Sequence, residues 1–202
     1  MNQPWYFILG FVAQILFSLR VFVQWVLSEK AKKVVSPAIY WQLSLLASII
    51  FSIYGWLRGD FAIILGQFFT YYIYIWNLKR KNRWIKLNRL LRYIIIILPV
   101  LALIFIVSEG ISTKNRLFDN ISLPLLVFGS VGQIIFTLRF IYQWWYSRSR
   151  NESILPSGFW ILSLAGATIT IVYGVFRRDP VLIIGHGAGF FAYARNLWLS
   201  KR

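Results

Sequence analysis

Long apolar runs, separated by short polar segments, dominate the chain. Most of them approach the roughly 20 residues that a helix needs to cross a bilayer. The runs lie near residues 5–27, 38–57, 61–78, 93–107, 122–146, 157–176 and 180–199. This pattern predicts an all-α membrane protein with seven transmembrane helices.

The two ends of the chain repeat each other. Residues 10–78 align with residues 129–197 without a gap, at a shift of 119 positions. Many identities are Gly, Trp or polar residues, which shared hydrophobicity alone does not match. They include Gly10 and Gly129, Gln14 and Gln133, Arg20 and Arg139, Gln24 and Gln143, Trp41 and Trp160, Tyr74 and Tyr193, and Asn77 and Asn196. We therefore predict three parts: a three-helix repeat (1–80), a basic loop with a linker helix (81–120), and a second repeat (121–202).

The linker helix follows from counting. A unit with three spans begins on one side of a membrane and ends on the other, so its copy would be inverted if joined directly. One extra span restores the direction, which gives a 3+1+3 arrangement of two parallel triple-helix bundles. Repeats of this kind are related by an axis along the membrane normal.

The basic residues predict the orientation, because cytoplasmic loops carry an excess of Lys and Arg. With the N-terminus outside, 14 basic residues fall in cytoplasmic segments and 5 in outer ones. Seven of the 14 lie in the block 79–92. We therefore expect a multi-pass protein with its N-terminus outside and its C-terminus in the cytoplasm.

Composition agrees with a membrane protein. The 202 residues are 58% hydrophobic and only 14% charged, against roughly a quarter charged in soluble domains. A net charge of +16 in a soluble protein would indicate nucleic acid, but here Lys and Arg gather between the apolar runs, so no nucleic-acid partner is expected. With no cysteine and one histidine, neither a disulfide, a metal site nor another cofactor is expected.

The first helix of each repeat carries polar residues on one face. Together with Phe17 and Trp25, Gln14, Arg20 and Gln24 fall within an arc of about 140°, at 100° per residue, and Gln133, Arg139 and Gln143 repeat the stripe. One interpretation is snorkelling or helix pairing. The functional interpretation is a polar cavity wall that binds an anionic or hydroxyl-rich ligand, because a guanidinium suits phosphate or carboxylate.

The third helix of each repeat has its own polar face. Tyr74 and Asn77 lie on it, as do Tyr193 and Asn196 in the second copy, and they are candidates to line the same cavity. The glycines on this face favour close helix contact. Asp60 and Asp179 stand where the third helices begin, and we expect them to cap free N–H groups there.

Two further candidates are open to two interpretations each. His186 replaces Gln67 of the first copy; it is either a proton relay or, as we favour, a hydrogen-bonded packing residue. Trp41 and Trp160 either belong to interfacial aromatic belts or stack on a sugar ring.

Catalysis is the weakest interpretation of the sequence. Each acidic residue falls in a predicted loop or at a helix start, namely Glu29, Asp60, Glu109, Asp119, Glu152 and Asp179. No paired carboxylates and no nucleophile–base spacing occur.

Both copies carry a recognisable motif. The pattern Gly-x3-Gln-x2-Phe-x2-Arg-x3-Gln-Trp, followed by Ser-Pro, Trp-x2-Ser, Tyr-Gly and Asp, resembles the LAB-N family, named for the lipid A biosynthesis N-terminal domain. The second copy departs from it with Leu155 before Pro156. The family is similar to the PQ-loop and SWEET group of three-helix-repeat transporters. The resemblance implies a SWEET-like fold, a bacterial inner membrane and a translocation path between the bundles.

Three functions follow as hypotheses. The first is a transporter or flippase of a glycolipid, such as a lipid A precursor or a polyprenyl-phosphate-linked sugar. The second is a SWEET-like carrier of a soluble sugar or metabolite, and the third a non-catalytic membrane partner of a glycosyltransferase. The family name implies lipid-A-disaccharide synthase, but the 202 residues contain no nucleotide-sugar domain, so we do not carry over transferase activity.

Overall fold

Helices account for most of the described residues. The computed structural model describes residues 5–58, 61–112 and 122–201. Seven α-helices form there: α1 (Trp5–Ala31), α2 (Ala38–Arg58), α3 (Phe61–Arg80), α4 (Arg89–Ser112), α5 (Leu123–Ser149), α6 (Ser157–Phe176) and α7 (Pro180–Leu199), with a 3-10 turn, η1 (Trp84–Lys86). The all-helical prediction is confirmed. Helices α1 and α4 run further than expected, so Glu29 and Glu109 lie in helices rather than loops.

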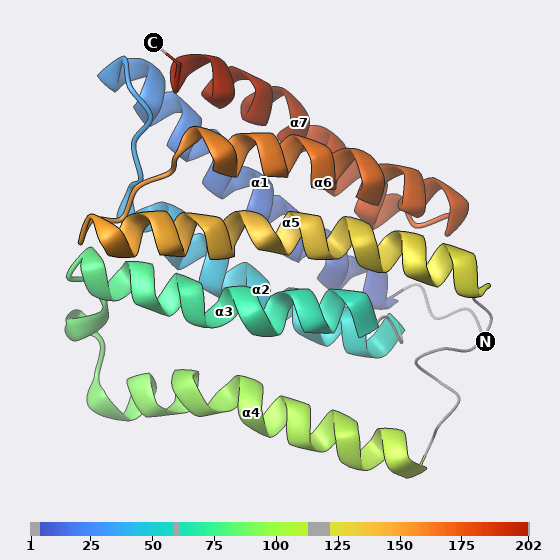
Figure 1. The fold of residues 1–202 in the computed structure, drawn as a ribbon. Coiled ribbons are helices and arrows are strands. Elements are labelled where there is room, and N and C mark those ends of the chain that lie inside the picture. The colour runs from blue at the N-terminus through green and yellow to red at the C-terminus, as the bar shows by residue number, and fades with distance from the viewer. Residues whose placement is uncertain (1–4, 59–60, 113–121, 202) are drawn as a thin grey trace.

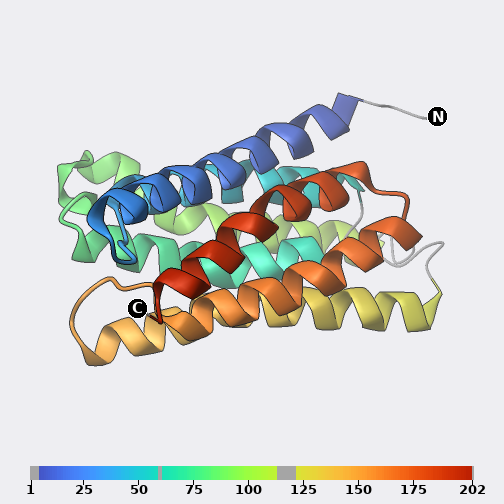
Figure 2. The same cartoon turned by 90° about the horizontal axis from the view of Figure 1, so that it is seen from above.

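Six of the helices close into a ring. Helix α2 packs between α1 and α3, and α6 packs between α5 and α7. The two triplets meet where α1 contacts α7 and where α3 contacts α5. Helices α1 and α5 start at the same end of the molecule and run in the same direction, because α4 returns the chain (Figures 1 and 2).

The outside of the ring is apolar. Four of the described helices, α1, α2, α5 and α6, are long and apolar enough to cross a membrane. Large aliphatic and aromatic side chains face outward along them and along α7; Ile15 and Phe191, for example, are 63% and 83% exposed. So much exposed apolar surface suits a hydrocarbon surround rather than water. The structure is thus consistent with a membrane protein.

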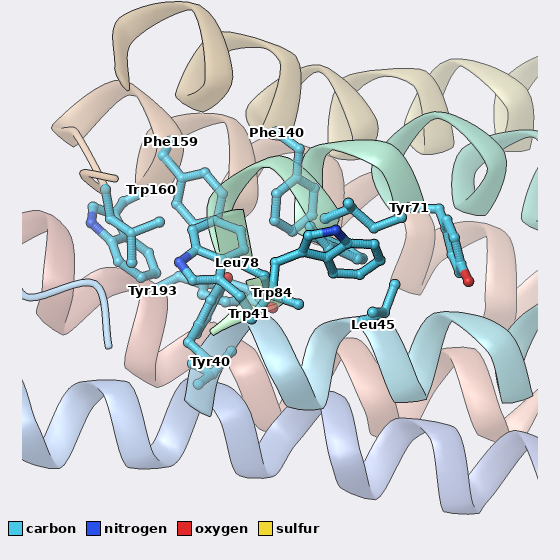
Figure 3. Close-up of a cluster of buried hydrophobic side chains, with 14 of the residues drawn as sticks. Tyr40, Trp41, Leu45, Tyr71, Leu78, Trp84, Phe140, Phe159, Trp160 and Tyr193 are labelled. Carbon is cyan, nitrogen blue, oxygen red and sulfur yellow. The ribbon is translucent and has the colours of Figure 1, made fainter. Parts of the chain in front are cut away.

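Aromatic side chains fill the middle of the ring, where the two repeats meet. Figure 3 shows Trp41, Phe140, Trp160 and Tyr193 among them, and Tyr74 belongs to the same cluster. The ring centroids of Trp41 and Tyr74 lie 6.1 Å apart, and those of the equivalent pair, Trp160 and Tyr193, lie 6.2 Å apart. The duplication is therefore visible in the packing of the core as well as in the sequence.

Helix α4 stands outside the ring and packs on α3 (Figure 1). Pro99 lies inside α4, and because proline has no N–H, the carbonyl of Ile95 four residues earlier loses its helical partner. The hydroxyl of Tyr71 donates to that carbonyl at 2.9 Å. The hydroxyl of Tyr72 donates to the carbonyl of Ile96 at 3.3 Å. Two tyrosines of α3 thus hold α4 at its proline.

We expect Tyr71→Phe to loosen α4 from the ring. Tyr71 is buried, and removing its hydroxyl leaves a carbonyl without a partner, which costs about 1–3 kcal/mol. Hydrogen exchange of α4 in detergent measures the change. Tyr72→Phe is the matched control, because its bond is longer and exposed and its loss should cost less than about 1 kcal/mol. Equal protection in both variants would contradict this account.

Candidate functional site

A small polar cavity lies between the two repeats. It has a volume of about 40 Å³, well below the roughly 300–1,000 Å³ of most ligand pockets. Most of its lining consists of equivalent pairs: Gln14 and Gln133, Phe17 and Phe136, Ser18 and Thr137, Arg20 and Arg139, Gly66 and Gly185, Gln67 and His186, Thr70 and Gly189, and Tyr74 and Tyr193, with Phe51 and Phe140 completing the wall. The cavity therefore lies at the pseudo-symmetry axis of the duplication.

Arg20 reaches the cavity from α1. It is 2% exposed, and its Nη1 donates to the hydroxyls of Ser44 at 2.6 Å and Tyr74 at 3.4 Å. Its guanidinium carbon also lies 4.5 Å from the ring centroid of Phe17. Neutral hydroxyls and an aromatic face hold this cation.

Arg139 repeats this arrangement from α5. It is 1% exposed, donates to Ser163 at 3.3 Å, and has its guanidinium carbon 3.4 Å from the centroid of Phe136. Both guanidinium carbons lie near the ring of Phe140, at 5.4 Å for Arg20 and 4.5 Å for Arg139. The two cations are therefore neighbours.

These two cations have no counter-charge in the described part of the chain. The ion pairs found there, Arg58–Asp179 and Arg195–Glu29, lie elsewhere. The Nε atoms of Arg20 and Arg139 are buried without a hydrogen-bond partner among the described residues. Burying an ion costs several kcal/mol unless it is paired, and cation–π contacts offset about 0.5–2 kcal/mol each. An anionic group in the cavity would supply what is missing.

Glutamine and glycine bring the repeats together beside the arginines. A Cβ atom on Gly185 of α7 would collide with the side chain of Gln14, and one on Gly66 of α3 with that of Gln133. The glycines therefore give the opposite repeat's glutamine room to enter the cavity wall.

Asparagine–glutamine pairs close one end of the ring. Gln24 donates to Asn196 at 2.9 Å across the contact of α1 and α7. Gln143 and Asn77 exchange hydrogen bonds of 3.0 and 3.1 Å across the contact of α5 and α3. All four residues are fully buried. These pairs hold the repeats together without lining the cavity.

The loop between α1 and α2 meets the loop between α5 and α6 at the same end of the ring. The hydroxyls of Ser36 and Ser153 lie 3.0 Å apart, and Ser153 donates to Asn77 at 2.7 Å. Trp41 donates through Nε1 to Ser36 at 2.9 Å. Trp160 has no such partner among the described residues, because Leu155 occupies the position equivalent to Ser36. This closure is thus asymmetric.

A buried carboxylate closes the other end. Asp179 accepts from the hydroxyl of Tyr54 at 2.9 Å and pairs with Nε of Arg58 at 2.6 Å. It also accepts from the N–H groups of Val181 and Leu182, at 3.0 and 3.3 Å. The predicted capping role of Asp179 is confirmed. The equivalent prediction for its counterpart at position 60 lies outside the described residues.

His186 is the main chemical difference between the cavity's two halves. It is 7% exposed, and its ring lies 4.5 Å from that of Phe136. Its Nδ1 and the Oε1 of Gln67 are buried without a partner in the described part of the chain. Both atoms are placed to meet a hydrogen-bonding ligand, and the ring packs edge-on against Phe136.

The structure brings together about half of the predicted site. The predicted residues that line the cavity are Gln14, Arg20, Tyr74, Gln133, Arg139, His186 and Tyr193. Four others, Gln24, Asn77, Gln143 and Asn196, form the amide pairs that close one end of the ring. Trp41 and Trp160 are wholly buried and pack against Tyr74 and Tyr193. Sequence reasoning missed Ser44 and Ser163 as partners of the arginines. Their recurrence 24 residues after each arginine is the signal that identifies them.

The fold and the cavity define a class: an apolar helical protein built from a duplicated three-helix unit, with a polar seam between the copies. The profile of the family described as "Lipid A Biosynthesis N-terminal domain" matches residues 9–79 and 128–198. The chain belongs to this family, and the tandem duplication is confirmed.

Known relatives agree with the family. The chain is 32% identical over 213 residues to a lipid-A-disaccharide synthase of Chlamydia trachomatis serovar D, covering 98% of this chain and 34% of the relative. It is 28% identical over 211 residues to the Chlamydia muridarum protein of that name (98% and 34%) and 29% over 199 residues to that of Chlamydia pneumoniae (95% and 33%). The chain thus spans about a third of these relatives. No solved structure matches it.

Proposed function

We propose that the chain is a multi-pass membrane protein with seven spans in a SWEET-like 3+1+3 arrangement, its N-terminus outside and its C-terminus in the cytoplasm. The position of the basic segments supports this orientation. The loop after α1, the turn η1 and the loop after α5 lie at the end of the ring where the chain finishes (Figure 1). That end is the one expected to face the cytoplasm. A bacterial inner membrane is its proposed location.

Within this topology, we propose transport or flipping of a phosphate-bearing glycolipid of the lipid A or cell-envelope polysaccharide pathway. The observation that carries the proposal is the pair of buried arginines without a counter-ion at the axis between the repeats. Substrate phosphate would bind between Arg20 and Arg139. The family and its relatives support the lipid A pathway.

The small cavity fits a protein closed at both ends. The amide pairs close one end and the carboxylate of Asp179 the other. A sugar head group needs more room than about 40 Å³, so transport requires the repeats to separate alternately at each end. Parallel repeats with a site at their interface are suited to such movement.

A second candidate is a non-catalytic membrane partner that presents a glycolipid to a glycosyltransferase. The chain matches about a third of the length of relatives named lipid-A-disaccharide synthase, which favours this role. The cavity would then hold the phosphate without carrying it across. A SWEET-like carrier of a neutral sugar is less well supported, because two cations without counter-charge disfavour a neutral ligand.

Proteoliposomes distinguish these functions. We expect flipping of a fluorescent polyprenyl-phosphate sugar and no uptake of free sugar. Gly185→Leu should reduce flipping tenfold or more, because its side chain displaces Gln14 into the cavity. Gly187→Leu is the matched control on the same helix, since an added Cβ there meets nothing within 4 Å. Absence of flipping by the folded wild-type protein would reject transport and leave the presenting role.

A further inference from the structure

The two contacts that close the ring differ in charge, because the ion pair of one contact is not kept at the equivalent positions of the other. Between α1 and α7, Arg195 pairs with Glu29 through bonds of 2.5 and 3.1 Å, and Trp25 donates to the same carboxylate at 2.9 Å. Between α5 and α3, the equivalents of Glu29 and Arg195 are Arg148 and Trp76. The acid of one contact has become a base in the other.

Tryptophans hold the cations of the second contact. The ring centroids of Trp76 and Trp144 lie 6.5 Å apart. The guanidinium carbon of Arg80 lies 5.2 Å from the centroid of Trp76, and that of Arg148 lies 5.2 Å from the centroid of Trp144. In the described part of the chain, neither arginine pairs with a carboxylate. Arg80 and Arg148 therefore lie here without a carboxylate partner; Arg80 donates to the side-chain oxygen of Asn151 at 3.1 Å, and the carboxylate of Glu152 interacts with Lys81.

An open apolar groove leads away from these cations. It follows α3 between α4 and α5 and has a volume of about 490 Å³. Aliphatic and aromatic side chains line it, including Phe69, Ile73, Ile96 and Ile141, and Trp76, Trp144 and Lys79 lie at its basic end. The groove exists because α4 packs on α3 without closing onto α5 (Figure 1).

We propose that this groove binds one anionic phospholipid, with a hydrocarbon chain along α3 and its phosphate at Arg80, Arg148 and Lys79. Charge complementarity supports this occupant, because two arginines without a carboxylate partner lie where the apolar groove ends. Basic pockets between membrane helices at the cytoplasmic side are suited to anionic head groups. The proposed topology places this end of α3 at that side. The site depends on membrane insertion but not on transport.

Lipid binding to the full-length protein in detergent tests the proposal. Native mass spectrometry with added phosphatidylglycerol should show one retained lipid, with phosphatidylcholine binding at least tenfold more weakly. Arg80→Gln combined with Arg148→Gln should weaken phosphatidylglycerol binding tenfold or more. Arg83→Gln combined with Arg150→Gln is the control, because it removes as much charge from the same end without touching the tryptophan pair. That control should bind normally.

A second variant introduces the ion pair of the α1–α7 contact into the α5–α3 contact. Trp76→Arg with Arg148→Glu supplies the acid–base pair found between α1 and α7, so the protein should stay folded and lose the lipid. The proposal would be overturned if the two lipids bound equally or if phosphatidylglycerol still bound to both variants. It would also be overturned if the wild-type protein had the mass of a dimer and the variants that of a monomer, because a second copy would then cover this face. Because no transport is measured, failure here leaves the proposed function untouched.

Discussion

Replacing Arg139 with methionine is expected to weaken binding of a sugar phosphate tenfold to a hundredfold, and replacing Arg20 as well should abolish it. A hydrogen bond to a charged group contributes about 1.5–3 kcal/mol, and each 1.4 kcal/mol is a factor of ten. Both guanidiniums face the cavity and have a buried Nε atom to offer. Titration calorimetry with glucose 1-phosphate measures the loss, because this probe has no lipid chain to occupy the groove beside α3.

The stability of the ligand-free variant distinguishes a binding role from a structural one. An unpaired buried cation destabilises the fold, and a well-packed apolar residue of similar volume is often neutral or stabilising in its place. Arg139→Met should therefore keep or raise the unfolding temperature while losing the ligand. Arg139→Lys keeps the charge without the planar fork and should bind at an intermediate level. Unchanged binding of the sugar phosphate by Arg139→Met would show that Arg139 does not bind the phosphate.

Much of the fold was predictable because membrane helices follow local rules. An apolar run of sufficient length must be helical in lipid, since all its backbone groups need partners within the segment. Residues such as Pro156 and Asp179 fix where helices begin, and the latter caps α7 as expected. The gapless duplication then predicts that the two copies pack alike, and their aromatic cores do so. The passage of all seven helices through a membrane stays a prediction.

The candidate site was only half predictable, because a helical face does not specify depth or partner. Gln14 and Gln24 share one stripe of α1, yet the first lines the cavity and the second binds Asn196 at the end of the ring. Which residue meets the opposite repeat depends on how closely the helices approach, and glycines such as Gly185 set that distance. No periodicity in one sequence records it.

Contacts between segments far apart in sequence were the least predictable. Pro99 in α4 indicates a carbonyl without its helical partner, but only packing shows that Tyr71 supplies the hydroxyl. Leu155 stands in the second copy where Ser36 stands in the first. As a result, the indole N–H of Trp41 has a hydrogen-bond partner and that of Trp160 has none among the described residues. The sequence shows where the two copies differ, but only the structure shows which hydrogen bonds each difference changes.

The two ion pairs of α7 should differ several-fold in their effect on stability. Asp179→Asn is expected to lower the free energy of unfolding by about 3–5 kcal/mol, because breaking a buried pair leaves the remaining charge poorly compensated. The side chain of Asp179 is 1% exposed and that of Arg58 is 12% exposed. The same carboxylate also caps α7 and accepts from Tyr54, so one substitution weakens several bonds.

Glu29→Gln is the matched control, since it changes a carboxylate to an amide in the ion pair that α1 makes with the other end of α7. The side chains of Arg195 and Glu29 are 40% and 35% exposed, and exposed pairs contribute about 0–1 kcal/mol. Unfolding in detergent followed by circular dichroism compares the two variants at one lipid concentration. A clear loss in Asp179→Asn alone would show that the pair next to α2 holds the first and second repeats together. Equal losses would mean that burial does not decide the strength of these pairs, and the closure of the ring at the Asp179 end would need another explanation.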